Sequence, residues 1–196
     1  MRVAVCISGR GSNLRALLAA LGPGAPAQVA LILSNSAEAG GLALGREAGI
    51  PSVVLQDHRN AGGMLELLER HGIELLVLAG YLKRVPAEVV ERYRGRIINV
   101  HPALLPDFGG KGMYGIHVHR AVLAAERRES GATVHLVDEE YDRGRILAQE
   151  RVPVLAGDTP ERLAARVLEV EHRLLPAVVL AAARAGHPVP IEPSPR

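Results

Sequence analysis

The chain has 196 residues, 48% of them hydrophobic, which is enough to bury one core of single-domain size. Its 23 basic and 21 acidic residues leave a formal charge of +2, too small to indicate nucleic-acid binding through bulk charge. The single cysteine, Cys6, excludes an internal disulfide framework and a multi-cysteine metal site. No apolar run approaches the roughly 20 residues of a membrane span, and the N-terminal run is too short for a signal peptide, so we expect a cytoplasmic protein.

The first hundred residues alternate between short apolar runs typical of strands and segments with helical spacing. In chain order the pattern predicts a strand at 3–7, a helix at 14–21, a strand at 29–33, a helix at 41–48, a strand at 52–55, a helix at 64–70, a strand at 74–79, a helix at 86–93 and a strand at 96–100. Because each strand is followed by a helix, these strands are expected to lie parallel.

The second half differs in composition. Residues 101–115 are rich in Pro and Gly and predict a long loop of the kind that often carries function. After a helix at 118–127, an antiparallel and rather exposed strand pair is expected at 133–137 and 146–152. A last helix is expected at 161–185, kinked or split by Pro176.

The alternation predicts the α/β class, with a Rossmann-like, mostly parallel twisted sheet, helices on both faces and an antiparallel portion in the C-terminal half. We expect a single domain over residues 1–187, with its phosphate-binding part first, and an extended or disordered tail at 188–196. Ligands of such sheets bind beyond the carboxyl ends of the strands.

The loop after the first strand, Gly9-Arg10-Gly11-Ser12-Asn13, resembles the start of a dinucleotide-binding fingerprint. Leu14 stands where the third glycine would be, and no acidic residue directly follows the second strand. Two interpretations stay open with about even weight. The loop binds one phosphate at a helix N-terminus, or it is an ordinary turn with polar caps.

Asn99 and His101 lie two residues apart at the end of the strand 96–100, so on an extended chain their side chains face the same way. Pro102 holds His101 away from helical angles. A carboxamide and an imidazole in this position can stabilise an oxyanion and handle a proton, or they can simply cap the strand.

Other polar residues give weaker signals. Asp142 sits at a turn between two predicted strands and by itself is typical of a turn aspartate. His117 and His119 have the spacing of a metal pair but no further ligands, so no metal is expected. His135 is expected to be packed or to support other residues, and Cys6 to lie in the core.

Five motifs, in this order, resemble the glycinamide ribonucleotide formyltransferases of purine biosynthesis. They are ISGRGSNL at 7–14, VLAGY at 77–81, INVHPALLP at 98–106, GATVHLVDEEYDRG at 131–144 and VPVLAGDT at 152–159. The resemblance extends from residue 1 to about residue 185. Methionyl-tRNA formyltransferases share the Asn, His and Asp core but carry an additional C-terminal domain.

The resemblance implies roles for particular residues. Catalysis falls to Asn99, His101 and Asp142, with Thr133 and His135 supporting them. The ribonucleotide would bind Gly11, Ser12, Asn13 and Glu171. The folate would lie along Arg59, Tyr81, Leu82, Lys83, Arg84, Val85, Val90, Ile97, Val137 and Asp138. The departures from the family pattern are Lys83, Leu168, Arg143 and Arg145.

The activity implied by the resemblance is transfer of a formyl group from 10-formyltetrahydrofolate, the co-substrate, to the amine of glycinamide ribonucleotide. In that mechanism Asn99 and a protonated His101 stabilise the oxyanion while Asp142 orients His101 and accepts a proton. The implied partners are small molecules, with no nucleic acid and no membrane, and the protein would be a monomer or a homodimer. Alternatives are formylation of another amine, or a non-catalytic folate- or phosphate-binding protein of the same fold.

Overall fold

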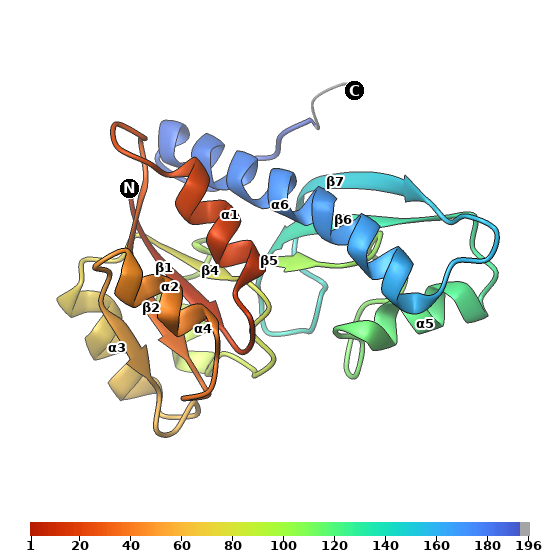
Figure 1. The fold of residues 1–196 in the computed structure, drawn as a ribbon. Helices are drawn as coiled ribbons and strands as arrows, with labels where there is room; N and C mark the ends of the chain where they lie inside the picture. Colours follow the sequence, from red (N-terminus) through yellow and green to blue (C-terminus); the bar gives the residue numbers. More distant parts are fainter. Residues whose placement is uncertain (193–196) are drawn as a thin grey trace.

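The computed structural model describes residues 1–192 and shows one sheet of seven strands with helices packed against it (Figure 1). The strands are β1 (Arg2–Ile7), β2 (Gln28–Ser34), β3 (Ser52–Val54), β4 (Leu75–Leu78), β5 (Ile97–His101), β6 (Glu129–Leu136) and β7 (Ile146–Pro153). The helices are α1 (Ser12–Ala20), α2 (Gly41–Glu47), α3 (Ala61–Arg70), α4 (Ala87–Arg92), α5 (Ile116–Ala124) and α6 (Pro160–Ala185). The predicted α/β class is confirmed, and each predicted strand and helix is present with slightly different ends.

Five strands run parallel in the order β3-β2-β1-β4-β5. The side chains of β1 alternate between two cores. Val3, Val5 and Ile7 pack with residues of α1 and α6, whereas Ala4 and Cys6 pack with residues of α3 and α4 on the other face. Both faces of β1 are therefore covered, which is why its sequence is continuously apolar. Cys6 lies in the core as predicted, and burial raises the pKa of its thiol.

The last two strands complete the sheet, because β6 pairs antiparallel with both β5 and β7. The predicted pairing of the segments 133–137 and 146–152 is confirmed, but the expected exposure of β6 is wrong. Its residues 130–135 are all buried, since β6 lies between two strands and α6 packs against it. An alternating sequence such as TVHLV does not reveal that its polar members face other protein groups.

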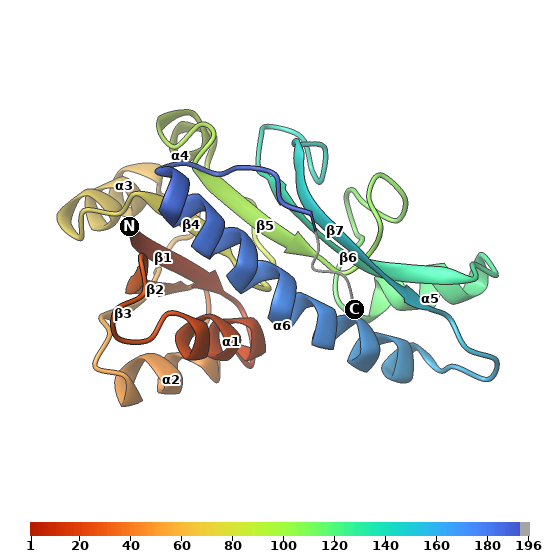
Figure 2. The same ribbon diagram turned by 90° about the horizontal axis from the view of Figure 1, so that it is seen from above.

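Helix α6 is one continuous helix of 26 residues, so the expected split at Pro176 does not occur. Figure 2 shows it running across the sheet toward the side where the N-terminus lies. Thr159 caps its first turn by accepting a hydrogen bond from the Arg162 N–H, and Gly186 ends it in the left-handed conformation. Extensive burial of its apolar stripe keeps the helix intact through the proline, which itself is buried.

The order of the strands reverses between β1 and β4, and the loops that follow these two strands contact each other. The Ser8 N–H donates to the Gly80 carbonyl at 3.1 Å, and the Leu82 N–H donates to Ser8 Oγ at 2.8 Å. Such a reversal is where ligands bind in open α/β sheets. Within residues 1–192, no helix is long and apolar enough to cross a membrane.

Candidate functional site

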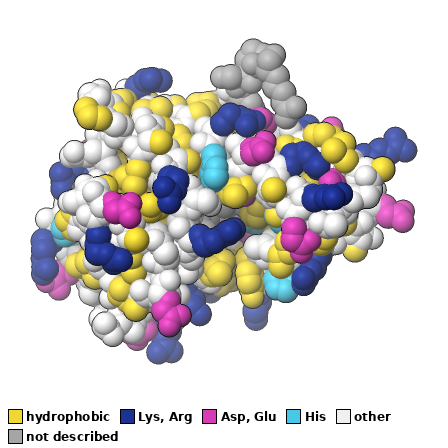
Figure 3. Space-filling model, viewed as in Figure 1, with side chains coloured by type: hydrophobic (Ala, Val, Ile, Leu, Met, Phe, Trp, Pro, Cys, Tyr) yellow, Lys and Arg dark blue, Asp and Glu magenta, His cyan; other side chains and the backbone are white. Residues whose placement is uncertain are grey.

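A cavity of about 1080 Å³ opens beyond the carboxyl ends of β4 and β5. Its wall is formed by the loops after β1, β4, β5 and β6 together with parts of α5 and α6. The cavity lies beside the reversal of strand order, where the fold predicts a ligand site. On the face seen in Figure 3, basic and acidic side chains are interspersed, in line with the small net charge.

The pairing of β5 with β6 sets the position of Asn99. The register puts Asn99 opposite His135 and His101 opposite Thr133. The His135 ring donates from Nδ1 to the Leu136 carbonyl at 2.7 Å, so its Nε2 is free to accept a hydrogen bond. The Asn99 Nδ2 amide donates to that nitrogen at 3.1 Å. His135 thus fixes the orientation of the Asn99 carboxamide.

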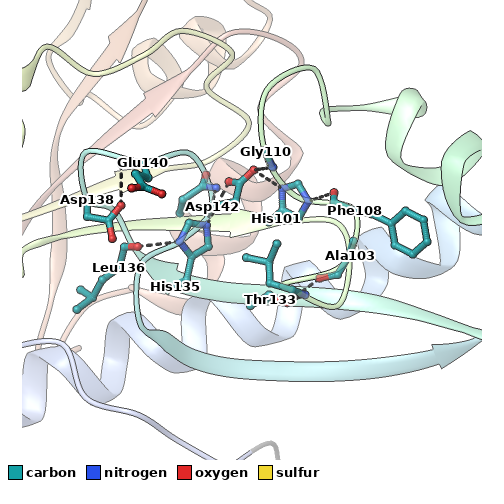
Figure 4. Close-up of polar contacts among 12 residues, drawn as sticks. His101, Ala103, Phe108, Gly110, Thr133, His135, Leu136, Asp138, Glu140 and Asp142 are labelled. Carbon is teal, nitrogen blue, oxygen red and sulfur yellow. Dashed lines mark hydrogen bonds and ion pairs between the residues drawn. The ribbon is translucent and has the colours of Figure 1, made fainter.

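His101 and Asp142 approach each other from different elements (Figure 4). His101 Nε2 lies 2.8 Å from the Phe108 carbonyl, and because a carbonyl only accepts, Nε2 carries the hydrogen. Its Nδ1 therefore faces Asp142 Oδ2, at 3.7 Å. The other carboxylate oxygen of Asp142 lies 3.6 Å from His135 Nε2. The turn that carries Asp142 thus brings its carboxylate between two imidazoles, which its position at a predicted turn did not reveal.

The ionisation of this group departs from the sequence-based expectation of a protonated His101. Burial lowers the pKa of His101, and the opposing effect of the Asp142 carboxylate does not compensate for it. Burial acts to raise the pKa of Asp142, but the contact with His135, the neighbouring His101 and the Gly110 N–H, which donates at 2.8 Å, together hold it below its ordinary value. In the free protein at neutral pH, His101 is therefore neutral and Asp142 is ionised.

Thr133 supports the site through the backbone. Its hydroxyl donates to the Ala103 carbonyl at 2.6 Å and accepts from the Leu105 N–H at 3.1 Å. Gln149 Nε2 also donates to the Thr133 hydroxyl, at 2.9 Å, and to the Leu105 carbonyl, at 3.0 Å. Three of these hydrogen bonds reach Ala103 or Leu105 directly, so the backbone that follows His101 is held in place.

The loop after β1 forms a tight connection into α1. Gly11 is the N-cap residue with a φ of 78°, and a Cβ there would lie 2.6 Å from the Gly41 Cα. Asn13 donates from Nδ2 to Glu171 Oε2 at 2.6 Å, joining α1 to α6. Burial raises the pKa of Glu171 to about 7 against the effect of that hydrogen bond. Glu171 lines the cavity, whereas Gly11, Ser12 and Asn13 are not among the residues that line it.

Most of the residues expected to contact folate line the cavity together: Tyr81, Leu82, Lys83, Arg84, Val85, Val90, Val137 and Asp138. Two do not. Ile97 is fully buried within β5, in the core against α3 and α4. Arg59 is exposed and pairs with Asp57 at 3.1 Å, outside the cavity lining. Arg59 is thus separated from the other expected folate contacts, whereas Ile97 packs behind the cavity in the same hydrophobic cluster as Tyr81 and Val85.

Several lining residues were not assigned to a binding site from the sequence: Arg10, Lys111, Tyr114 and His119, of which His119 was considered only as a metal ligand. Arg10 stands in the middle of the glycine-rich loop, which was the available signal for it. The others come from long loops or from a helix face whose direction only the fold determines. The described residues contain no cluster of three or more His, Cys, Asp or Glu side chains able to hold a metal ion.

Comparison with solved structures finds the same fold. A phosphoribosylglycinamide formyltransferase from Anaplasma phagocytophilum superposes with a TM-score of 0.88 and 37% identity, covering 94% of this chain and 87% of the other. An enzyme of the same name from Brucella melitensis gives a TM-score of 0.83 and 43% identity, covering 93% and 95%.

Comparison of sequences points the same way. The Arabidopsis thaliana protein named phosphoribosylglycinamide formyltransferase, chloroplastic, is 46% identical over 91% of this chain, but the match spans only 64% of its own length. The chain likewise spans 59% of the Vigna unguiculata protein of that name. The Haemophilus influenzae phosphoribosylglycinamide formyltransferase is 38% identical, over 91% of this chain and 85% of its own. The model of the formyl transferase family matches residues 1–179. As the motifs indicated, the chain belongs to the formyl transferase family.

Proposed function

We propose that this protein transfers a formyl group from 10-formyltetrahydrofolate to the amine of glycinamide ribonucleotide. The observation that carries the proposal is the convergence of Asn99, His101 and Asp142 at the end of β5, in the wall of one large cavity. Family membership supports the reaction class. The names of the relatives support the choice of the ribonucleotide as acceptor.

The chemistry follows from these three side chains. The amine of the ribonucleotide attacks the formyl carbon, forming a C–N bond and placing negative charge on the formyl oxygen. Asn99, whose amide is oriented by His135, donates a hydrogen bond to that oxygen. The attacking nitrogen must lose a proton, and N10 of the folate must gain one as its bond to the formyl carbon breaks. The ionised Asp142 receives the first proton, directly or through water.

His101 is neutral before the reaction, and the proton that Asp142 takes from the attacking amine passes to His101 Nδ1 before it is delivered to N10 of the folate. A proton on Nδ1 would convert the 3.7 Å approach to Asp142 into an ion pair, which becomes favourable once substrates exclude water from the cavity. The positive charge of the resulting imidazolium then stabilises the negative charge on the formyl oxygen. The protein therefore develops its positive charge when the substrate develops its negative one.

The two substrates would occupy different ends of the cavity. We assign the ribonucleotide to the end formed by α6 and the loop after β1, with Glu171 toward the ribose and Gly11, Ser12 and Asn13 toward the phosphate. The folate takes the end lined by residues 81–85 and 137–138. The 10-formyltetrahydrofolate acts as a carrier, so the protein supplies orientation and electrostatics, and the proposed reaction has no metal step.

The remaining assignments concern the whole protein. A single domain over residues 1–187, a cytoplasmic location and a monomer or homodimer stay predictions. Of the tail, residues 188–192 have no helix or strand, with the Ile191 N–H donating to the Leu147 carbonyl at 2.8 Å, and residues 193–196 lie outside the described part.

A turnover assay tests the proposed function. The purified protein is incubated with glycinamide ribonucleotide and 10-formyltetrahydrofolate, and both tetrahydrofolate and the N-formyl product are quantified. We expect equal amounts of the two products. Turnover only with another amine, such as that of an amino sugar nucleotide, would reject the acceptor, and binding of both ligands without product would reject catalysis.

A further inference from the structure

Three histidines line the cavity: His101, His119 and His135. The rings of His101 and His135 have hydrogen-bond partners within the protein. The ring of His119, on α5, has none, although only 3% of the residue is exposed. His119 also takes no part in the chemistry described above.

The burial of His119 is unfavourable for the stability of the protein. Its Nδ1 is completely enclosed and has no hydrogen-bond partner. A buried polar atom without a partner typically destabilises a protein by about 1–3 kcal/mol, so an apolar side chain at this position would serve the fold better. Such a cost is typical of a residue that serves a ligand.

Only one nitrogen of the ring is available to a ligand. Because Nδ1 is closed off by protein, a molecule in the cavity can reach His119 only at Nε2. Burial, with a smaller contribution from the nearby His101, lowers the pKa of His119 to about 4. The ring is therefore neutral at neutral pH, so His119 cannot bind a phosphate group as a permanently charged cation.

The surroundings of His119 identify the substrate it would meet. Helix α5 packs against α6, whose residues Ala164, Ala165, Leu168 and Glu171 line the same cavity. This is the end assigned to the ribonucleotide. Leu168 also lines this end of the cavity, and its apolar side chain cannot form a hydrogen bond with the substrate.

We propose that His119 is a positioning residue that hydrogen-bonds a neutral polar group of the ribonucleotide, a ribose hydroxyl or the amide, through Nε2. This inference rests on the proposed function. It gives the acceptor substrate a contact from α5, opposite the contact that Glu171 would give it from α6.

The test compares His119→Phe with a matched control, His172→Phe. His172 on α6 also has an enclosed ring nitrogen without a partner, but it does not line the cavity. Both substitutions remove the same kind of buried polar atom. For His119→Phe we expect the KM for glycinamide ribonucleotide to rise about three- to tenfold, because one neutral hydrogen bond is lost. The KM for the folate should not change. The Tm should equal or exceed that of the wild type, because a buried polar atom without a partner is removed. The control should leave both KM values unchanged.

Two further variants test which nitrogen matters. Gln places its terminal amide near the position of Nε2, whereas Asn reaches only as far as Nδ1. His119→Gln should therefore retain near-wild-type KM for the ribonucleotide and His119→Asn should not. Equal KM values for His119→Phe and His172→Phe, or rescue by Asn and not by Gln, would overturn the inference. Absence of turnover in the wild type would instead overturn the proposed function, which keeps the two failures distinct.

Discussion

At the residue scale, neighbouring imidazoles in the site have different proton arrangements. His101 donates from Nε2 to Phe108, which turns Nδ1 toward Asp142, while His135 donates from Nδ1 and so presents an acceptor to Asn99. Backbone carbonyls thus determine which nitrogen of each ring is available. The Asn99 amide and the Asp142 carboxylate are oriented before any substrate arrives, so no binding free energy is needed to orient them.

Removing either residue expected to stabilise the oxyanion should slow the chemical step. We expect Asn99→Ala and His101→Ala each to lower kcat by about 100-fold, while the affinity for folate changes little, because the oxyanion exists only along the reaction path. Steady-state kinetics and equilibrium binding of the folate separate the two effects. A variant with wild-type kcat would remove that residue from the mechanism.

Glu171 should make the stability of the protein depend on pH. Its pKa rises from an ordinary 4.5 to about 7 because burial disfavours the carboxylate. The folded state therefore holds a proton that the unfolded state loses, so the contribution of Glu171 is fully present below pH 4.5 and is lost as the pH rises to about 7, by on the order of 3 kcal/mol. Chemical denaturation of the wild type and Glu171→Gln at several pH values measures the difference.

The comparison isolates Glu171 from other titrating groups such as His119. The Gln side chain can still accept the hydrogen bond from Asn13 but cannot ionise. We expect the stability of Glu171→Gln relative to the wild type to increase from pH 4.5 to pH 8. A difference that is flat over this interval would mean that Glu171 does not titrate as its burial indicates.

Some of the residues of the site could be predicted from the sequence, and others could not. Asn99 and His101 could be predicted because a spacing of two on a strand end puts both side chains on one side. Asp142 looked like an ordinary turn residue, since its approach to His101 depends on how the loop after β6 folds. His119 could not be predicted as a cavity residue, because its burial depends on the packing of α5.

At the element scale, the loop from β6 to β7 carries Asp142 and closes against the end of β6. Asp142 itself has a φ of 56°, a conformation that Asp and Asn tolerate better than most residues. Gly144 lies so close to the strand that a Cβ would be 1.8 Å from the Leu136 carbonyl oxygen. The loop therefore depends on the missing side chain of Gly144 for its position.

Gly144→Ala should displace this loop. We expect a stability loss of about 2 kcal/mol, because the added Cβ meets backbone that cannot rotate away, and a fall in kcat because Asp142 moves. The control is Gly22→Ala, where the new Cβ meets no atom within 4 Å. Unchanged kcat in Gly144→Ala would show that the loop does not need this close approach.

Some properties of the strands and helices could be predicted from sequence patterns and others could not. The parallel strands were predictable from continuous apolar runs, which only a strand covered on both faces requires. The burial of β6 was not, because its polar residues Thr133 and His135 are buried with hydrogen-bond partners in the protein, which the sequence does not show. Pro176 was expected to kink or split the last helix, yet α6 is continuous because its tertiary packing outweighs the local penalty of the proline.

At the scale of the whole molecule, the sheet joins two halves with different tasks. The parallel half supplies the loops after β1 and β4, and the antiparallel half supplies Thr133, His135 and the loop with Asp142. The two halves meet at β5, whose last residues are Asn99 and His101. The cavity therefore forms only when both halves are folded, which explains why its lining could not be assembled from any one segment of sequence.

The central claim is that Asp142 works with His101 and Asn99 in formyl transfer, and the rate of a single turnover in Asp142→Asn tests it most directly. Formyl-¹³C donor is mixed with excess enzyme and ribonucleotide, and the label is followed to the product by NMR. Asn tolerates the backbone conformation at position 142, so the fold should persist, as circular dichroism would verify. Loss of the carboxylate removes the proton acceptor and lowers the pKa of His101 further, so we expect the rate to fall by at least about 100-fold. A folded Asp142→Asn protein that transfers the label at the wild-type rate would contradict the account.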